Sequence, residues 1–356
     1  MMKNNVCSGC GACENICPKK CIKINKKNKK RFFRIIDKAV CVNCGLCEKV
    51  CPHNKSISLY DSIEAYNGFS KAPSVLERSS SGGIATEIYK YCIRRGILCV
   101  GVILTKSGDL KYEFLTSEKR IRMAAGSKYA YSDMADIYEK VCSLLRADKQ
   151  EIVFIGLPCH AYALRKYCKT RGLETKKLTV CDIVCHGVVM PYFYKRHINK
   201  KCNNKAEKIF FRKKDNPYGL VIYSNGREVY SKTRNEDEYM LMFQNFILAE
   251  SCRTCAFSNK QRTGDITIKD CSSPAEKRMF KIPMNQSSIL INSDKGRELW
   301  KKINNNIISY QYSVEDICNE DIRLQGKYIK YKYEKLFWFL ECFLGYKITA
   351  KIMLKK

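Results

Sequence analysis

The stretch 5-NVCSGCGACENICPKKC-21 contains the pattern CxxCxxCxxxCP, and 41-CVNCGLCEKVCP-52 repeats it. The eight patterned cysteines are Cys7, Cys10, Cys13, Cys17, Cys41, Cys44, Cys47 and Cys51. Three cysteines at positions i, i+3 and i+6 can surround one face of a 4Fe–4S cubane, and the fourth, followed by proline, ligates the other cluster of a two-cluster ferredoxin. The spacing therefore predicts a two-cluster ferredoxin-like domain over residues 1–60.

The same logic predicts how the ligands are shared between the two clusters. One cluster takes Cys7, Cys10, Cys13 and Cys51, and the second takes Cys41, Cys44, Cys47 and Cys17. Structural zinc also uses paired CxxC motifs, but it gives no reason for a third cysteine at i+6 or for a Cys-Pro ending that occurs twice. Cys21 fits neither cluster, so we expect a buried thiol there. Between the two motifs, CIKI and RFFRIID are predicted to form a hairpin of two short strands.

Composition limits the class of protein. The chain has 356 residues, of which 45% are hydrophobic, and this length suggests two or three domains. Its 22 cysteines, without a basic and apolar leader, favour metal-bound thiolates in a reducing cytoplasm. The apolar run 336-LFWFLECFLGY-346 is shorter than a membrane-spanning helix and is interrupted by Glu341, so no transmembrane segment is expected.

The charge points to acidic partners. The chain has 65 basic and 35 acidic residues, a formal net charge of +30, which attracts polyanions, anionic membrane surfaces or acidic proteins. The lysines are spread along the chain without a nucleic-acid-binding motif, so no specific nucleic-acid binding is expected. An acidic redox protein such as a ferredoxin or flavodoxin, or a partner oxidoreductase, suits the charge better.

Beyond the cysteine motifs the pattern is that of an α/β domain. Residues 61–78 are mixed and polar, as in a linker. They are followed by a Ser-Gly-Gly turn, a helix from Ile84 and the apolar strand ILCVGVIL. Two further strands, in 151-EIVFIGLPCH-160 and 178-LTVCDIVCHG-187, end in turns that contain glycine. This order predicts a sheet with its functional site at the strand ends.

Two features of this region have a functional and a structural interpretation. A Ser-Gly-Gly turn that opens a helix offers free amides to a phosphate, although a serine there is usually only a helix cap. Cys159 and Cys185 follow strands, and Cys252 and Cys255 form a CxxC pair. A single cysteine in such a place is most often a small core residue.

Six segments, in this order and spacing, resemble the beta subunit of coenzyme F420-reducing hydrogenase and dehydrogenase, especially bacterial relatives with an N-terminal two-cluster ferredoxin domain. They are SSSGGIATEIYKY, GSKYAYS, GLPCHAYALRKY, DIVCHGVVMP, IFFRKKDN and CRTCAFSNKQRTGDITIKD. The resemblance covers residues 1–275. It implies that residues 79–300 form a flavin-type α/β catalytic domain after the ferredoxin-like domain, an α+β or α/β architecture. The mixture of lysines with aromatic and apolar residues near the C-terminus predicts in addition a basic, aromatic-rich helical region over residues 301–356.

The resemblance also implies the cofactors. In the family a 4Fe–4S cluster lies beside a non-covalent FAD that exchanges electron pairs with a deazaflavin or another organic substrate. A third 4Fe–4S cluster is accordingly expected at Cys159, Cys185, Cys252 and Cys255, with Cys271 as a competing ligand. The candidates for FAD contacts are Ser81, Gly82, Gly83, Thr86, Lys128, Tyr129, Gly156 and Pro158. No catalytic residue is assigned; His160 could donate a proton or simply be a hydrogen-bonded turn residue.

The chain departs from the family pattern at the expected FAD site. Relatives usually have threonine and glutamine where this chain has Leu157 and His160, and glycine where it has Lys269.

The favoured function is an FAD-dependent iron–sulfur oxidoreductase that passes electrons between clusters, flavin and a deazaflavin-like or other small redox substrate. The alternative, which Leu157 and Lys269 favour, is an iron–sulfur electron-transfer module without flavin or a substrate of its own. A zinc-stabilised nucleic-acid-binding protein is the third hypothesis.

The C-terminal helices are expected to cover the main domain, with an anionic membrane as the alternative contact.

Overall fold

The N-terminal domain is small and built around its two cysteine motifs. The computed structural model describes residues 7–54, 57–202, 206–212, 219–243, 246–271, 286–327 and 332–354. The elements of the first domain are α1 (Ala12–Ile16), β1 (Ile22–Asn25), β2 (Phe33–Ile36) and α2 (Leu46–Lys49). Strands β1 and β2 pair antiparallel, which confirms the predicted hairpin. Each helix begins directly after a left-handed glycine, Gly11 or Gly45, which explains the glycine that both motifs place before their third cysteine.

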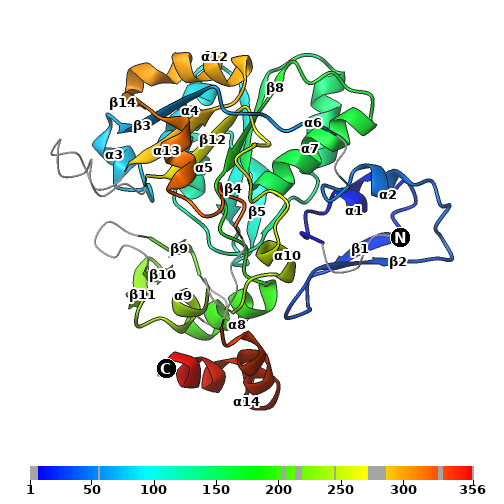
Figure 1. The fold of residues 1–356 in the computed structure, drawn as a ribbon, viewed down its shortest axis with the longest axis vertical. Helices are drawn as coiled ribbons and strands as arrows, with labels where there is room; N and C mark the ends of the chain where they lie inside the picture. The colour runs from blue at the N-terminus through cyan, green and yellow to red at the C-terminus, as the bar shows by residue number, and fades with distance from the viewer. Residues whose placement is uncertain are drawn as a thin grey trace.

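A mixed sheet of nine strands forms the centre of the larger domain (Figure 1). Its spatial order is β14-β3-β13-β12-β8-β7-β4-β5-β6. The strands are β3 (Glu64–Ser70), β4 (Leu98–Leu104), β5 (Leu110–Phe114), β6 (Ser132–Asp133), β7 (Ile152–Gly156), β8 (Leu178–Ile183), β12 (Ile266–Asp270), β13 (Ser287–Ile291) and β14 (Ile307–Tyr312). The pairs β12–β8, β8–β7 and β7–β4 are parallel, so the carboxyl ends of these strands share one edge.

Helices cover both faces of this sheet. They are α3 (Pro73–Leu76), α4 (Ile84–Arg94), α5 (Glu118–Ala124), α6 (Ile137–Arg146), α7 (Pro158–Thr170), α12 (Asp294–Ile303) and α13 (Val314–Asn319), with a 3-10 turn over Asn304–Asn306. Along β7, Ile152 and Phe154 join the core beneath α6 and α7, whereas Val153 and Ile155 join the core beneath α4 and α12. A strand buried on both faces in this way is expected for the parallel centre of an α/β sheet.

A third group of elements lies beyond the edge of the sheet where the parallel strands end (Figure 1). It consists of α8 (Pro191–Cys202), β9 (Lys208–Phe210), β10 (Leu220–Ser224), β11 (Arg227–Lys232), α9 (Glu238–Phe243), α10 (Glu250–Arg253) and α14 (Glu334–Leu354). Strands β11, β10 and β9 form a separate antiparallel sheet. One continuous core joins α8, α9 and α14 to residues of β4, β5 and the N-terminal hairpin.

The expected strands at 97–104, 151–156 and 178–183 and the helix from Ile84 are present. Residues 64–70, inside the expected linker at 61–78, instead form strand β3, which lies between β13 and β14. Its polar residues Asn67 and Ser70 are fully buried, so polar composition misled the prediction. Similarly, β14 belongs to the main sheet although it lies after residue 301. No helix among the described residues is both long and apolar enough to span a membrane.

Candidate functional site

Four cysteines of the N-terminal domain surround a small cavity. Cys7, Cys10, Cys13 and Cys51 line a space of about 50 Å³, which we name the inner cluster site. Burial raises the pKa of Cys10 to about 12, and repulsion from neighbouring thiolates adds to the effect. Four thiols at one place favour a metal group, because binding a cation stabilises the thiolate form. The crossed two-cluster pattern predicts these same four cysteines as the ligands of one cluster.

Side chains of the sheet domain hold the backbone of the inner cluster site. The Tyr131 hydroxyl donates to the Gly9 carbonyl at 2.9 Å, and the Tyr138 hydroxyl donates to the Cys10 carbonyl at 3.0 Å. From α7, Lys166 Nζ donates to the Cys51 carbonyl at 2.7 Å and also to the Asn54 carbonyl. The inner site therefore faces the larger domain and is fixed to it.

The other motif is more exposed. Cys17, Cys41 and Cys47 are half-buried and Cys44 is exposed, so this outer cluster site lies nearer the solvent. The Sγ atoms of Cys17 and Cys21 are 3.4 Å apart. Cys21 is only 9% exposed, as expected for a buried thiol, and it lies next to the predicted cluster ligand.

Cysteines from three separate segments meet at a third place. Cys159 in the first turn of α7, Cys185 after β8, and Cys252 and Cys255 at α10 line one cavity of about 30 Å³, the third cluster site. Burial raises the pKa of Cys185 to about 11 and that of Cys252 to about 12. Cys271 follows β12 and is buried, but it is not part of this lining.

One buried arginine connects the segments of the third cluster site. Arg323 Nη1 donates to the Cys252 carbonyl at 2.9 Å, and Nη2 donates to the His186 carbonyl at 2.8 Å. The two acceptors belong to α10 and to the residue after Cys185. Arg323 thus holds two ligand segments together and places a positive charge next to the third cluster site.

Unsatisfied polar atoms surround these cavities. Within the described residues, Ser8 Oγ, His53 Nε2 and Ser251 Oγ are buried without a hydrogen-bond partner. Ser8 and His53 line both the inner and the third cluster sites, and Ser251 lines the third. Buried polar atoms are rarely left unpaired, and hydrogen bonds to the sulfurs are one way in which proteins tune iron–sulfur clusters. The residues present therefore fit clusters at both places.

Among the residues with described positions, no group of three His, Cys, Asp or Glu side chains converges closely enough to bind one metal ion.

A larger cavity of about 420 Å³ lies at the ends of the parallel strands. Six of the eight residues expected to contact FAD line it: Ser81, Gly83, Thr86, Lys128, Tyr129 and Gly156. Gly82 does not belong to this lining; its amide donates to Ser287 Oγ at 3.0 Å, and it packs against strand β3. Pro158 lines the third cluster site instead.

The cavity contains the start of α4. This helix has 11 residues and no side-chain cap at its N-terminus, and Ile84, Ala85 and Thr86 of its first turn line the cavity. Free amides at the positive end of a helix dipole suit a phosphate. The Ser80 hydroxyl, which also lines the cavity, accepts a hydrogen bond from the Ser127 amide at 2.7 Å. These groups fit the phosphate portion of a dinucleotide.

Two predicted side chains have clear local roles. Lys128 Nζ donates to the carbonyls of Ala124, Ala125 and Gly126 at 2.9, 3.2 and 3.1 Å. Burial lowers the pKa of Lys128 to about 7. Tyr129 stacks on Phe243 with ring centroids 4.7 Å apart, and burial raises the pKa of Tyr129 to about 12. Its ring lies at the cavity wall.

His160 is a buried structural residue. Its Nδ1 lies 3.1 Å from the Tyr112 hydroxyl, and burial lowers its pKa to about 4. His160 lies outside the lining of the large cavity and lines the third cluster site instead, and its contact with Tyr112 favours the structural interpretation.

Sequence reasoning missed the polar pairs of the cavity. His186 Nε2 lies 3.4 Å from Asp321 Oδ2, and both residues line the cavity. Burial raises the pKa of Asp321, but the hydrogen bond and charge of His186 outweigh it, so the pKa of this carboxyl is lowered. Lys269 also lines the cavity and lies 3.8 Å from Glu320. The Cys-His-Gly motif was a signal for His186, whereas nothing in the sequence linked it to Asp321.

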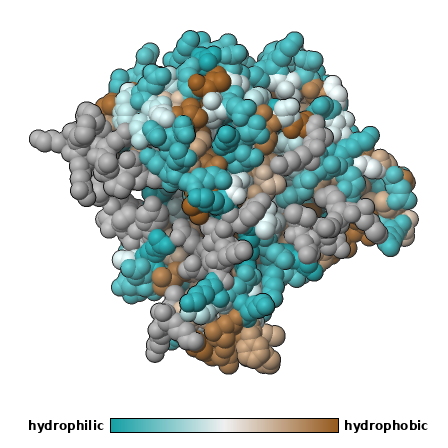
Figure 2. All heavy atoms as spheres, viewed as in Figure 1, coloured by the Kyte–Doolittle hydropathy of each residue, from teal (hydrophilic) through white to brown (hydrophobic). Residues whose placement is uncertain are grey.

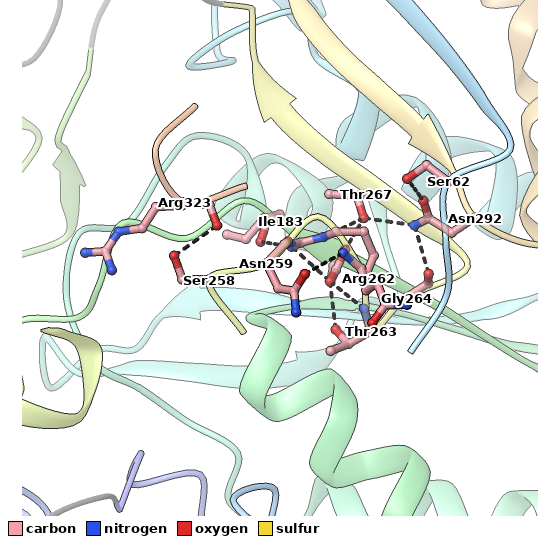
Figure 3. Close-up of polar contacts among 12 residues, drawn as sticks. Ser62, Ile183, Ser258, Asn259, Arg262, Thr263, Gly264, Thr267, Asn292 and Arg323 are labelled. Atoms are coloured by element: carbon pink, nitrogen blue, oxygen red, sulfur yellow. Dashed lines mark hydrogen bonds and ion pairs between the residues drawn. The ribbon is translucent and has the colours of Figure 1, made fainter. Parts of the chain in front are cut away.

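A buried polar network fixes the strands that form this edge (Figure 3). Arg262 Nη2 lies 3.1 Å from Asp182 Oδ2, and Thr263 Oγ1 donates to the same carboxylate at 2.7 Å. Asn292 Nδ2 donates to the Thr267 hydroxyl at 2.9 Å. Asp182 lies in β8, Thr267 in β12, and Asn292 follows β13, so the network joins three neighbouring strands. The Gln-Arg-Thr-Gly-Asp segment after the CxxC pair is therefore structural.

Fold and sites together define an iron–sulfur α/β protein with an N-terminal 4Fe–4S domain. Residues 6–55 match the 4Fe–4S dicluster domain profile. Residues 65–139 match the N-terminal part, and residues 149–316 the C-terminal part, of the coenzyme F420 hydrogenase/dehydrogenase beta subunit. The chain belongs to this family and is one of its iron–sulfur electron-transfer members.

Among solved structures, the chain is similar to one of the F420-reducing nickel–iron hydrogenase complex from Methanosarcina barkeri, a xenon derivative. The identity is 16%, the TM-score is 0.49, and the match covers 71% of this chain and 83% of that chain. No curated protein sequence matches the chain.

Proposed function

We propose that this protein is an FAD-dependent iron–sulfur oxidoreductase that moves electrons between an acidic redox partner and a small redox substrate such as a deazaflavin. The observation that carries the proposal is that the sites share walls. Ser8 and His53 line both the inner and the third cluster sites. Four residues line both the third cluster site and the large cavity: Leu157, Cys185, Gly187 and Val188.

The order of the sites gives a path for electrons through the molecule. The outer cluster site includes the exposed Cys44, whereas the inner cluster site is bound to the sheet domain. A redox partner would therefore exchange electrons at the outer site, and the inner and third sites would connect it to the cavity. Basic residues near the outer site, such as Lys20, Lys38 and Lys49, favour an acidic ferredoxin or flavodoxin. A reducing cytoplasm suits such thiolate-rich chemistry.

The large cavity is the proposed place for FAD. The uncapped start of α4 would hold its phosphates, and the wall next to Leu157 and Cys185 would hold its ring near the third cluster site. A flavin supplies the exchange between single electrons from clusters and electron pairs for an organic substrate. His186, paired with Asp321, would hold a proton at Nε2 beside the same cavity.

One observation favours the alternative of an electron-transfer module without flavin. The Lys269 side chain occupies the cavity wall where relatives have glycine, and it is 3% exposed next to Glu320. A lysine at this position fills space that the flavin ring would need, although its positive charge could also attract an anionic cofactor. Lys269 is therefore the residue to test first in this cavity.

Cofactor content decides between these functions. The protein should be purified without oxygen and assayed for iron, acid-labile sulfide and flavin released by acid. About twelve irons and one FAD per chain support the oxidoreductase, since three cubanes contain four irons each. About twelve irons without flavin support the electron-transfer module. If the native chain gives this result but the Lys269→Gly variant binds FAD, Lys269 is the reason why the native chain lacks flavin. Zinc without iron would contradict both.

A further inference from the structure

The outer face of α14 carries a group of exposed apolar side chains. Phe339 is 61% exposed, Phe343 72%, Leu344 41% and Ile348 51%. The rings of Phe339 and Phe343 lie 4.9 Å apart. Figure 2 shows hydrophobic atoms gathered at the end of the molecule that α14 forms in Figure 1. Single exposed apolar residues are ordinary, but a contiguous group marks a contact surface.

These side chains are not needed for the packing of the helix. On its inner face, Phe337 stacks on Phe246 with ring centroids 4.9 Å apart. Phe193 of α8 contacts Trp338 at 6.1 Å and Tyr346 at 5.2 Å between ring centroids, so it holds both halves of α14, which bends at Gly345. The helix is therefore anchored from inside while its outer apolar face is left uncovered by the described chain.

The charges of α14 identify what the outer face can contact. Its lysines Lys335, Lys347 and Lys351 are exposed. Its carboxylates are engaged on the protein side: Glu334 pairs with Arg253, and the 3% exposed Glu341 pairs with Lys29 at 2.8 Å. The surface around the apolar group is consequently positive.

A second helix adds to this positive surface. Lys200 of α8 lies beside Lys347. The charge of Lys347 is the main cause that lowers the pKa of Lys200, and the negative charge of Glu238 opposes this shift more weakly. Two like charges held together at an exposed position gain stability when an anion lies between them. Lys200 therefore adds positive charge beside the helix that carries the exposed apolar side chains.

We propose that α14 docks the protein onto an anionic phospholipid bilayer. Phe339, Phe343, Leu344 and Ile348 enter the boundary between headgroups and acyl chains, while the lysines of α14 and Lys200 contact lipid phosphates. Apolar residues flanked by lysines are the pattern of helices that lie in the membrane interface. A second copy of the chain fits this surface less well, because two such positive faces would repel each other.

Vesicle flotation of the complete, cluster-loaded protein tests the proposal. The probes are vesicles of phosphatidylcholine alone and vesicles in which about a third of the lipid is phosphatidylglycerol, a fraction that gives a clearly negative surface. The protein should float with the anionic vesicles only, and high salt should weaken the binding. Phe339→Ser with Phe343→Ser should lower the partition coefficient at least about tenfold. Lys347→Gln and Lys351→Gln should each lower it about fivefold.

The control variant is Ile308→Ser, which removes a side chain that is 48% exposed on β14, far from α14 in Figure 1. It should bind anionic vesicles as the unchanged protein does. The proposal is overturned if anionic vesicles do not bind the protein, or if the double phenylalanine variant binds them equally well. It is also overturned if size-exclusion chromatography shows that this surface instead joins two copies, with a dimer that the double variant dissociates.

Discussion

The inner and third cluster sites are each lined by four cysteines but are assembled differently. Three cysteines of the inner site, Cys7, Cys10 and Cys13, lie within seven residues of one another, and only Cys51 comes from elsewhere. The third site takes Cys159, Cys185 and the Cys252–Cys255 pair from segments that are distant in the sequence. A local motif defines the first site almost alone, whereas the second exists only because the sheet brings strand ends together.

The largest expected effect tests whether the third site is independent of the N-terminal domain. The double variant Cys252→Ser and Cys255→Ser should lose about four of about twelve irons, because one cubane loses half of its ligands. Electron transfer from the outer cluster to a bound flavin should stop, while the two N-terminal clusters keep their electron paramagnetic resonance signals. The matched control is Cys342→Ser, at an exposed thiol of α14, which should keep all its iron. A double variant with unchanged iron would show that these cysteines are not ligands.

The next effect concerns the attachment of the N-terminal domain. Lys166→Met should lower the free energy of unfolding by about 2–3 kcal/mol, because the carbonyls of Cys51 and Asn54 lose a charged donor. Denaturation in urea, followed by cluster absorbance, measures it. Lys169→Met, at an exposed position of the same helix, is the control and should change stability by less than about 0.5 kcal/mol. Equal effects of the two variants would argue against a fixed domain arrangement.

A smaller effect tests His53, which lines both the inner and the third cluster sites. His53→Leu should lower the midpoint potential of a neighbouring cluster by about 40 mV, the equivalent of one hydrogen bond of about 1 kcal/mol for a one-electron couple. His53→Gln retains an N–H donor and should recover most of this shift. Potentiometric titration of the cluster signals gives both values. If the leucine variant keeps the original potential, the His53 Nε2 atom does not donate to a cluster.

The smallest effect is the pH dependence of the contact between the two domains. Burial raises the pKa of Asp133, but the hydrogen bond and charge of Lys26 outweigh it and lower this pKa below its ordinary value of 3.8. The ion pair therefore stabilises the protein fully above about pH 4 and loses its effect as the pH falls through the lowered pKa. With Asp133 41% exposed, its contribution stays under about 1 kcal/mol.

Asp133→Asn measures this contribution. Thermal unfolding from pH 6 down to pH 3 should show a smaller loss of stability in the variant than in the unchanged protein, because the variant has no carboxylate to protonate. Identical pH profiles would show that Lys26 and Asp133 do not pair in solution.

The fold was predictable where local patterns carry the information. The strands around residues 97–104, 151–156 and 178–183 are short apolar runs that end in turns, and each forms where expected. Strand β3 was not predictable in this way, because its residues Asn67 and Ser70 are polar yet fully buried between two other strands. Their burial depends on partners that are more than 200 residues away in the sequence.

The candidate site shows the same division. Six residues predicted to contact FAD line one cavity, because they lie in loops between helices and strands, at the end of a strand or at the start of a helix. Gly82 and Pro158 lie beside such residues in the sequence but face other neighbours. The pairs His186–Asp321 and Lys269–Glu320 come from distant segments, so no spacing could reveal them.

The sequence by itself determined the iron–sulfur character of this protein and its family, because cluster ligands must follow fixed spacings and the turn motifs keep their order. The tertiary structure alone decided which cysteines share a cavity with which polar atoms, how Lys166 joins the two domains, and which face of α14 is left outside. These features depend on contacts between segments far apart in the chain. Such contacts arise only when the apolar surfaces of the sheet and helices are buried together.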